Sequence, residues 1–231
     1  MVPQRLVAFI APPGAGKDTQ AEIFAQRFGF ERFEMSKVIE ENFAAASPGD
    51  KVIQEQKKIW ISGGLLDSKL IIKWTLDAVR KLHAEGKSLV LSGPLRKVEE
   101  AEADMPVFEE LYGRENIWIF HINVSLEVSV DRNRHRRICE ENRHPVPNTP
   151  EYKDLKICPW DGSPLIHRKL DEPDIIRERY EAYEKETVPV LDFLREKGYK
   201  VIDINGEQKL EKVSDEIASY VKDNFKDVKR Y

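Results

Sequence analysis

The sequence predicts an α/β layered domain built on a parallel β-sheet. Near-continuous apolar runs, which are typical of buried parallel strands, alternate with longer segments of helical periodicity. This alternation favours parallel strands joined by crossover helices over half-exposed hairpins. A glycine-bearing turn that contains one lysine directly follows the first apolar run. The chain has 231 residues, 41% of them hydrophobic, which is enough apolar material for one large core.

The individual elements are predicted from the same alternation. The predicted strands are the apolar runs 6–10, 88–91, 117–124 and 200–204, with a shorter one near 32–35. The predicted helices occupy 19–28, 51–61, 69–85, 98–112, 125–137, 173–197 and 210–225. Residues 139–170 break the rhythm, because they contain five prolines and two cysteines but no sustained periodicity. We expect either a small inserted subdomain or a long ordered loop there.

The turn after the first predicted strand has the features of a phosphate-binding loop. Residues 11–20 read Ala-Pro-Pro-Gly-Ala-Gly-Lys-Asp-Thr-Gln and lead directly into a predicted helix. Backbone N–H groups in such a turn converge on an anion, the helix N-terminus adds partial positive charge, and Lys17 adds a full charge. Gly14 and Gly16 allow positive φ and a close approach to phosphates. The alternative, an ordinary turn with a surface lysine, leaves the order of strand, loop, lysine and helix unexplained.

Two positions of this turn depart from the general G-x-x-x-x-G-K-[ST] pattern. Ala11 stands at the first glycine, and Asp18 stands at the usual hydroxyl position, with Thr19 one residue later. We still predict that the turn binds a nucleoside triphosphate. Its predicted ATP-binding residues are Pro13, Gly14, Ala15, Gly16, Lys17, Asp18 and Thr19.

Arginines flank the aperiodic segment on both sides. They are Arg132, Arg134, Arg136 and Arg137 before it, and Arg168, Arg177 and Arg179 after it. Arg132 and Arg136 are four residues apart and would share one face of a helix. Phosphoryl transfer needs positive charge from groups that close over the site and exclude water, which a folding segment with such flanks would supply. The alternative is a solvated basic helix face.

Composition narrows the setting of the protein. The formal net charge is −4 and 34% of the residues are charged, so nothing favours binding to nucleic acid or membranes. The two cysteines imply no disulfide framework and fit a reducing compartment. The apolar run 6–11 is too short for the core of a signal peptide. We expect a cytoplasmic protein with no nucleic-acid or membrane partner, and we take the monomer as its state.

Four separated blocks of the chain resemble the adenylate kinases and their nucleoside monophosphate kinase relatives. The blocks are Pro13-Gly14-Ala15-Gly16-Lys17 with Thr19-Gln20, then Gly93 and Arg96 in Leu-Ser-Gly-Pro-Leu-Arg-Lys, then Val130-Asp131-Arg132 with Arg136-Arg137, and finally Arg168, Arg177-Glu178-Arg179, Tyr183 and Thr187-Val188-Pro189. The resemblance implies a single P-loop kinase domain over residues 1–231, with three layers and a five-stranded parallel sheet. It also implies a helical insertion at 36–68 that binds the nucleoside monophosphate, and a mobile lid at 137–170.

The resemblance further implies an activity. The γ-phosphoryl group of ATP would move to a nucleoside monophosphate, by default AMP (ATP + AMP ⇌ 2 ADP), with Mg²⁺ accompanying ATP. The implied catalytic residues are Lys17, Arg96, Arg132, Arg168 and Arg179. Arg132 and Arg136 would contact ATP, and Thr19 would reach Mg²⁺ through water.

The acceptor half matches the family unevenly. The positions that align with acceptor-binding residues are Met35, Lys37, Glu40, Gly93, Arg96, Glu100, Arg168 and Arg179. Glu40 stands where the family has an arginine for the monophosphate, Glu100 where a glutamine reads the base, and Ser92 where an aspartate lies near magnesium. A glutamate repels a phosphate, so Glu40 cannot simply replace arginine. Alternatively, the ungapped alignment slips here and Lys37 takes the place of the arginine.

These departures leave two other functions open. The enzyme could phosphorylate a nucleoside monophosphate with another base, because a glutamate at position 100 alters which base edge fits. The chain could also be a degenerate homologue that binds ATP, with a regulatory role or slow ATPase activity.

The lid region contains four candidate zinc ligands. Zinc-bearing lids of the family carry a C-x₂-C…C-x₂-[CD] pattern, which Cys139, Cys158 and Asp161 match. Asn142 stands at the second cysteine, and His144 follows two residues later. A set of two cysteines, a histidine and an aspartate is chemically acceptable for Zn²⁺. The alternative is a lid without metal that polar hydrogen bonds hold together.

Overall fold

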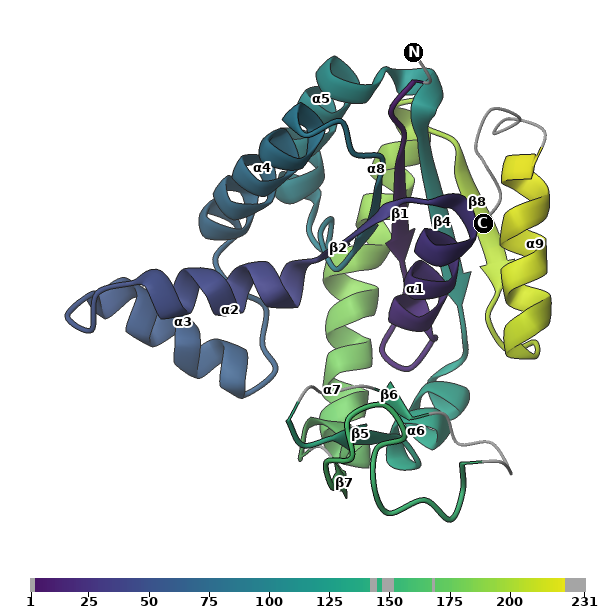
Figure 1. The fold of residues 1–231 in the computed structure, drawn as a ribbon. Helices are drawn as coiled ribbons and strands as arrows, with labels where there is room; N and C mark the ends of the chain where they lie inside the picture. Colours follow the sequence, from purple (N-terminus) through teal and green to yellow (C-terminus); the bar gives the residue numbers. More distant parts are fainter. Residues whose placement is uncertain (1–2, 142–144, 147–151, 168, 223–231) are drawn as a thin grey trace.

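Five parallel strands form the central sheet of the protein (Figure 1). The computed structural model describes residues 3–141, 145–146, 152–167 and 169–222. In the sheet order β2-β3-β1-β4-β8, the strands are Glu31–Glu34, Leu89–Ser92, Leu6–Ile10, Ile117–Asn123 and Val201–Asn205. The three inner strands β3, β1 and β4 are buried along almost their whole length, as a parallel sheet covered on both faces requires. The predicted α/β fold with a five-stranded parallel sheet is confirmed.

Helices cover both faces of this sheet and make three layers. Alternate residues of β1 point to opposite faces, so Val7 packs with α1 (Lys17–Phe28) and α9 (Leu210–Lys222) in one hydrophobic cluster. Leu6 and Ala8 pack in the other cluster, with α4 (Ser68–Ala84), α5 (Val98–Tyr112) and α8 (Val188–Glu196).

Within the described ranges, no helix combines the length and the apolar character that crossing a membrane requires.

Two helices form an arm that projects from the edge of the sheet (Figure 1). The first, α2 (Met35–Ala45), starts directly at the end of β2, and α3 (Lys51–Ile61) returns beside it. The α3 helix matches its prediction, but the residue pattern gave no sign of α2. Only Met35 and Ile39 of α2 are buried, and no side chain caps its N-terminus, so the usual helix signals are weak.

The aperiodic region is a small inserted subdomain in its described part. Helix α6 spans Leu126–Arg134 and ends three residues earlier than predicted, because β5 (Arg137–Cys139) follows closely. With β6 (Pro145–Val146) and β7 (Leu165–Ile166), β5 forms a three-stranded antiparallel sheet. Short 3₁₀ turns lie at Arg114–Asn116 and Lys169–Asp171. We refer to residues 137–170 as the lid segment.

The helix predicted over 173–197 is interrupted in the structure. It consists of α7 (Pro173–Ala182), a π-helical turn (Tyr183–Thr187) and α8. Pro189 has no N–H to donate to the carbonyl four residues earlier, which explains why regular α-helical bonding fails just before it. The wider turn lets the Tyr183 hydroxyl meet Nε2 of buried His121 at 2.7 Å.

Candidate functional site

The glycine-bearing turn lies between β1 and α1, at the carboxyl edge of the sheet (Figure 1). Gly14 and Gly16 have φ of 73° and 86°, and Gly16 forms the N-cap of α1. A Cβ at Gly14 would collide with Nδ2 of Asn133 in α6, whereas one at Gly16 would meet nothing within 4 Å. Position 14 therefore demands glycine for both conformation and space, and position 16 for conformation alone.

Two buried polar residues of α6 lie against this turn, and one of them binds it. Ser129 Oγ donates a hydrogen bond of 2.7 Å to the carbonyl of Pro13, and Asn133 Nδ2 donates one of 2.7 Å to the carbonyl of Ser129. Neither residue is predicted from the sequence. Their spacing of four along a charged helix puts them on one face, which is the signal that would have indicated a buried polar contact.

Lys17 and Asp18 form an ion pair at the start of α1. Nζ of Lys17 lies 2.6 Å from Oδ1 of Asp18, whose side chain is 55% exposed. The pKa of Lys17 is lowered mainly by burial and also by the Arg96 and Arg32 charges, although Asp18 acts in the opposite direction. For Asp18, burial alone would raise the pKa, but the Lys17 ammonium outweighs it and holds the pKa well below its ordinary value.

The segment after β3 brings Arg96 to the same edge of the sheet. Gly93 has φ of 117°, and a Cβ there would approach Cβ of Met35 to 3.0 Å. Leu95 is buried and adopts φ of 62°, which is rare for a side chain of its size. Arg96 Nε donates to the carbonyl of Gly93 at 2.9 Å, and its backbone N–H donates to the Glu100 carboxylate at 2.8 Å. The local backbone therefore fixes the position of Arg96.

Glu100 lies inside the protein on the first turn of α5. It is 3% exposed, and burial raises the pKa of its carboxyl although Arg96 lowers it. One helical turn later, Asp104 is fully buried, and burial together with Glu100 raises its pKa to about 8. The carboxyl oxygens of Asp104 have no hydrogen-bond partner among the described residues. The role of Glu100 in reading a base stays a prediction, while its bond to the Arg96 backbone is a structural one.

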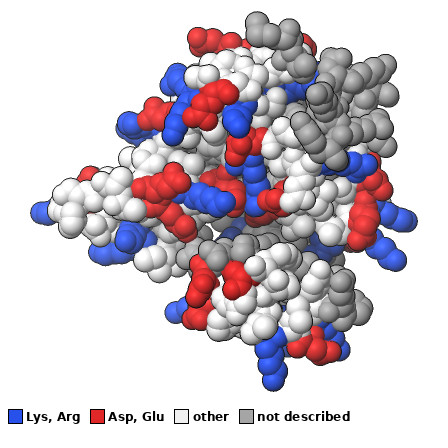
Figure 2. Space-filling view, viewed as in Figure 1, with Lys and Arg blue, Asp and Glu red and all other residues white. Residues whose placement is uncertain are grey.

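The arm carries the other predicted acceptor residues. Met35 is buried against the segment after β3, whereas Lys37 and Glu40 are exposed. Nζ of Lys37 lies 2.7 Å from the Glu34 carboxylate, which also lies 3.2 Å from Arg32. Acidic and basic side chains are interspersed across the middle of this face of the molecule, in keeping with such pairing (Figure 2).

The predicted ATP-binding arginines are placed differently from each other. Arg132 lies on α6, but Arg136 follows the end of that helix, so the expectation that both share one helix face is wrong. Arg136 instead binds buried Asp171 with two hydrogen bonds, one of them 2.9 Å between Nε and Oδ2. Arg179 donates to the Leu170 carbonyl at 3.3 Å. The predicted catalytic residue at position 168, Arg168, lies outside the described residues.

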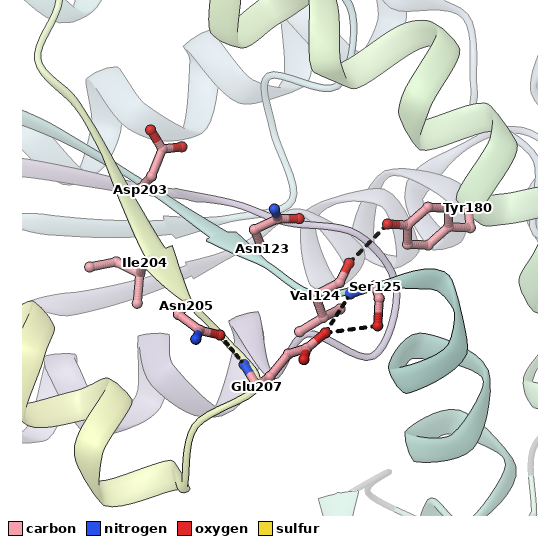
Figure 3. Close-up of a pocket in the computed structure, with 8 residues that line it drawn as sticks. All are labelled: Asn123, Val124, Ser125, Tyr180, Asp203, Ile204, Asn205 and Glu207. Atoms are coloured by element: carbon pink, nitrogen blue, oxygen red, sulfur yellow. Dashed lines mark hydrogen bonds between the residues drawn. The ribbon is translucent and has the colours of Figure 1, made fainter.

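A cavity of about 460 Å³ lies at the carboxyl ends of β4 and β8 (Figure 3). None of the phosphate-loop residues lines it. The Glu207 carboxylate accepts hydrogen bonds from Ser125 N and Oγ at 2.8 and 2.7 Å, and Tyr180 donates to the Val124 carbonyl at 2.8 Å. These polar groups of the cavity wall bind each other, so we place the candidate site at the phosphate loop instead.

Three of the predicted zinc ligands come together in the lid segment. One ligand atom each from Cys139, Cys158 and Asp161 lies within 4.8 Å of the other two. Both cysteines are buried and unbridged, and Sγ of Cys139 lies 3.1 Å from Oδ2 of Asp161. Two thiolates and a carboxylate are a donor set that fits Zn²⁺. The fourth predicted ligand, His144, lies outside the described residues.

The start of α1 offers donors of a different kind. The Asp18 carboxylate and the Thr19 hydroxyl follow Lys17 on the first helical turn, and both residues are accessible at least in part. Carboxylate and hydroxyl oxygens are the hard ligands that Mg²⁺ prefers, directly or through its water shell. The residues present therefore fit a magnesium ion that accompanies a bound triphosphate.

Comparison with known proteins agrees with this architecture. The family model described as "Adenylate kinase" matches residues 9–199. The adenylate kinase of Kosmotoga olearia is 32% identical over 213 residues, which cover 91% of this chain and 96% of that protein. The adenylate kinases of Petrotoga mobilis and Bacillus subtilis are each 32% identical, over 90% and 87% of this chain and 94% and 90% of their own lengths. The resemblance is confirmed, and the chain belongs to the adenylate kinase family of nucleoside monophosphate kinases.

Proposed function

We propose that the protein transfers the γ-phosphoryl group of ATP to a nucleoside monophosphate, with AMP as the default acceptor. The observation that carries this proposal is the convergence of cations at one sheet edge. Lys17 lies in the phosphate loop, and Arg96 and Arg32 are near enough to lower its pKa. Two phosphate groups need such opposing charge on both sides of the reacting bond.

The phosphate loop would hold the donor. Its backbone N–H groups and Lys17 bind the β- and γ-phosphates of ATP, as the fixed left-handed turns at Gly14 and Gly16 allow. Thr19 and Asp18 would hold the hydrated Mg²⁺, and the ion would supply positive charge against the negative charge that develops on the phosphates. No general base is required, because the acceptor phosphate is already an anion near neutral pH.

The lid segment would complete the donor side. Residues 137–170 close over the nucleotide, and Arg132, Arg168 and Arg179 stabilise the charge on the transferred group. Arg136 donates to Asp171 from Nε and Nη2, so it would contact ATP through its remaining N–H groups or after leaving Asp171. Zn²⁺ held by Cys139, Cys158 and Asp161, with His144 as fourth ligand, would fix the shape of this segment.

Arg96 would bind the acceptor phosphate. The strained backbone at Leu95 and the bonds to Gly93 and Glu100 hold its guanidinium in position before substrate arrives. Residues 36–68 would form the acceptor-binding insertion, with Met35 and Gly93 beside the monophosphate. Lys37 and Glu40 are exposed on α2, from which they would approach the acceptor phosphate.

A different acceptor base and a degenerate ATP-binding homologue are the competing functions. The observation that favours them is the placement of two carboxylates in the acceptor half, where Glu40 is exposed and Glu34 already pairs with Lys37. A coupled assay that offers ATP with AMP, GMP, CMP, UMP or dTMP in turn tests all three functions. We expect the highest kcat/KM with AMP. Preference for another base would support the second function, and ATP binding without transfer to any acceptor would support the third.

A further inference from the structure

The lysine of the phosphate loop has a carboxylate next to it. Asp18 occupies the position where the general loop pattern has a hydroxyl, and it holds Nζ of Lys17 at 2.6 Å. This pairing has two consequences for an arriving triphosphate. Lys17 must leave Asp18 before it can give its charge to phosphate, and the freed carboxylate then repels the same phosphate. Both effects would weaken the binding of the triphosphate to the loop, unless a cation pairs with the Asp18 carboxylate.

Two other carboxylates near this edge of the sheet, those of Glu34 and Glu22, already have cations of their own. Glu34 lies between Lys37 at 2.7 Å and Arg32 at 3.2 Å, and Glu22 pairs with Arg32 at 2.7 Å. Asp18 differs because its cation is the lysine that the nucleotide needs. Its side chain is also 55% exposed on the first turn of α1, so it can turn away from Lys17 without opening the core.

The end of β3 lies beside Asp18 but supplies no charge. Ser92 is buried there, and its hydroxyl is close enough to help lower the pKa of Asp18, though beyond normal hydrogen-bond geometry. A neutral hydroxyl cannot offset the charge of a divalent cation as a carboxylate does. Asp18 is therefore the residue of this pair that brings negative charge to the mouth of the loop.

We propose that Asp18 is a positioning residue for the divalent cation of ATP: it pairs with Lys17 in the empty loop and turns to the water shell of Mg²⁺ when MgATP binds. Lys17 then passes to the phosphates as Asp18 passes to the metal, so each charge exchanges one partner for another. This inference rests on the proposed function, because it requires that the loop binds ATP. The alternative role for Asp18 is structural, as an acidic residue that stabilises the N-terminus of α1.

The two roles differ in how ATP affinity responds to metal. We would measure the Kd of ATP by calorimetry for the wild type and Asp18→Asn, each in excess Mg²⁺ and in EDTA. With metal, the variant should bind ATP more weakly than the wild type. In EDTA it should bind ATP more tightly, because the repelling charge is gone and Lys17 is free. The coupling between Mg²⁺ and the mutation should be about tenfold, within the usual range for linked binding events.

Two further variants make the result specific. Asp18→Glu keeps the carboxylate and should restore most of the affinity that Mg²⁺ adds. Asp215→Asn removes an exposed carboxylate that pairs with Arg27 on the far part of α1, and should behave as the wild type. Binding of Mn²⁺ to the protein–ATP complex, followed by electron paramagnetic resonance, gives a second readout. It should weaken about tenfold in Asp18→Asn and not in Asp215→Asn.

The outcomes separate this inference from the proposed function. Equal changes in ATP affinity with and without metal would overturn the metal role and leave Asp18 a structural residue of α1. The metal role is also overturned if Asp18→Glu cannot be distinguished from Asp18→Asn. A wild-type protein that binds ATP in neither condition would instead refute the phosphate-loop assignment itself.

Discussion

The phosphate loop and the acceptor segment supply cations to the same edge of the sheet but are held by different means. Backbone shape defines the loop, through left-handed glycines and the buried Ser129 and Asn133 of α6. In the acceptor half the backbone fixes only Arg96, whereas the exposed side chains of the arm are held by pairing with acids, as Lys37 is by Glu34. The loop is therefore intolerant of small changes in its backbone. The acceptor half can change its side chains, and with them its specificity, without loss of fold.

The largest expected effect tests the loop. Lys17→Ala should lower ATP turnover by at least about two orders of magnitude, because the lysine acts where charge develops in the transition state. Steady-state kinetics and ATP affinity would be measured on the variant. Lys73→Ala is the matched control, since Lys73 is an exposed helical lysine paired with Asp77. Values near those of the wild type for Lys17→Ala would refute the loop assignment.

The next effect tests the acceptor half. Glu40→Arg should lower the KM of the acceptor by roughly 10- to 100-fold, because one charge-assisted bidentate contact is worth about 1.5–3 kcal/mol. The KM of ATP should stay nearly unchanged, since its ligands come from the loop and the lid segment. Lys37→Ala should raise the acceptor KM only if Lys37 already binds the monophosphate. If Glu40→Arg leaves the acceptor KM unchanged while Lys37→Ala raises it, then the alignment that places Glu40 at the family's arginine is wrong.

A third change separates space from conformation within the loop. Gly14→Ala places a Cβ against Asn133 at a positive φ, and should weaken ATP binding about tenfold through a displaced loop. Gly16→Ala is the control, because Gly16 lies in the same loop with φ of 86° but has no atom within 4 Å of its Cβ position, so it carries the conformational cost alone. Adding Asn133→Ala to Gly14→Ala should recover part of the affinity. Equal loss of affinity in both glycine variants would contradict a steric role for Asn133.

The last effect concerns the stability of the fold rather than catalysis, and it tests the buried carboxyl group of Asp104. The pKa of Asp104 is about 8 in the folded protein, against about 3.9 in an unfolded chain. The folded state therefore holds more protons between about pH 4 and pH 8, and the free energy of unfolding falls as pH rises through this window. The fall is at most about 1.4 kcal/mol per pH unit. Urea unfolding of Asp104→Asn should show a flatter profile and higher stability at pH 8, whereas exposed Asp77→Asn should follow the wild type.

Four of the strands could be predicted from the sequence because each contains a short apolar run bounded by turns, whereas β2 has a single apolar residue, Phe33. The run 6–10 coincides with β1, and the other four strands differ from their predicted bounds by no more than one residue at each end. Helix α2 could not, because it follows β2 without a turn and buries only Met35 and Ile39. The π-helical turn at Tyr183–Thr187 also carries no periodic signal that distinguishes it from a continuous helix.

The candidate site was predicted in its local parts and missed in its long-range ones. Lys17 and the two loop glycines belong to a contiguous motif, which a sequence displays directly. Ser129 contacts Pro13 across 116 positions of the chain, and Arg136 contacts Asp171 across 35. No spacing rule connects such residues, since the fold alone brings them together. Lys17 and Asp18 are adjacent in the sequence, so their ion pair could be anticipated. The exposure of Asp18 and the burial around Lys17, on which the proposed role of the pair depends, become visible only in the fold.

The ion pair between Arg136 and Asp171 has a consequence for how the lid segment can vary. Arg136 directly precedes the lid segment and Asp171 directly follows it. Their contact therefore joins the two ends of the segment and sets a fixed distance between them. The entropic free-energy cost of closing a loop between two joined ends grows only with the logarithm of the loop length, by about 0.6 kcal/mol for each doubling. The segment can therefore gain or lose residues, or exchange a metal for hydrogen bonds, while the core between β4 and α7 is left undisturbed.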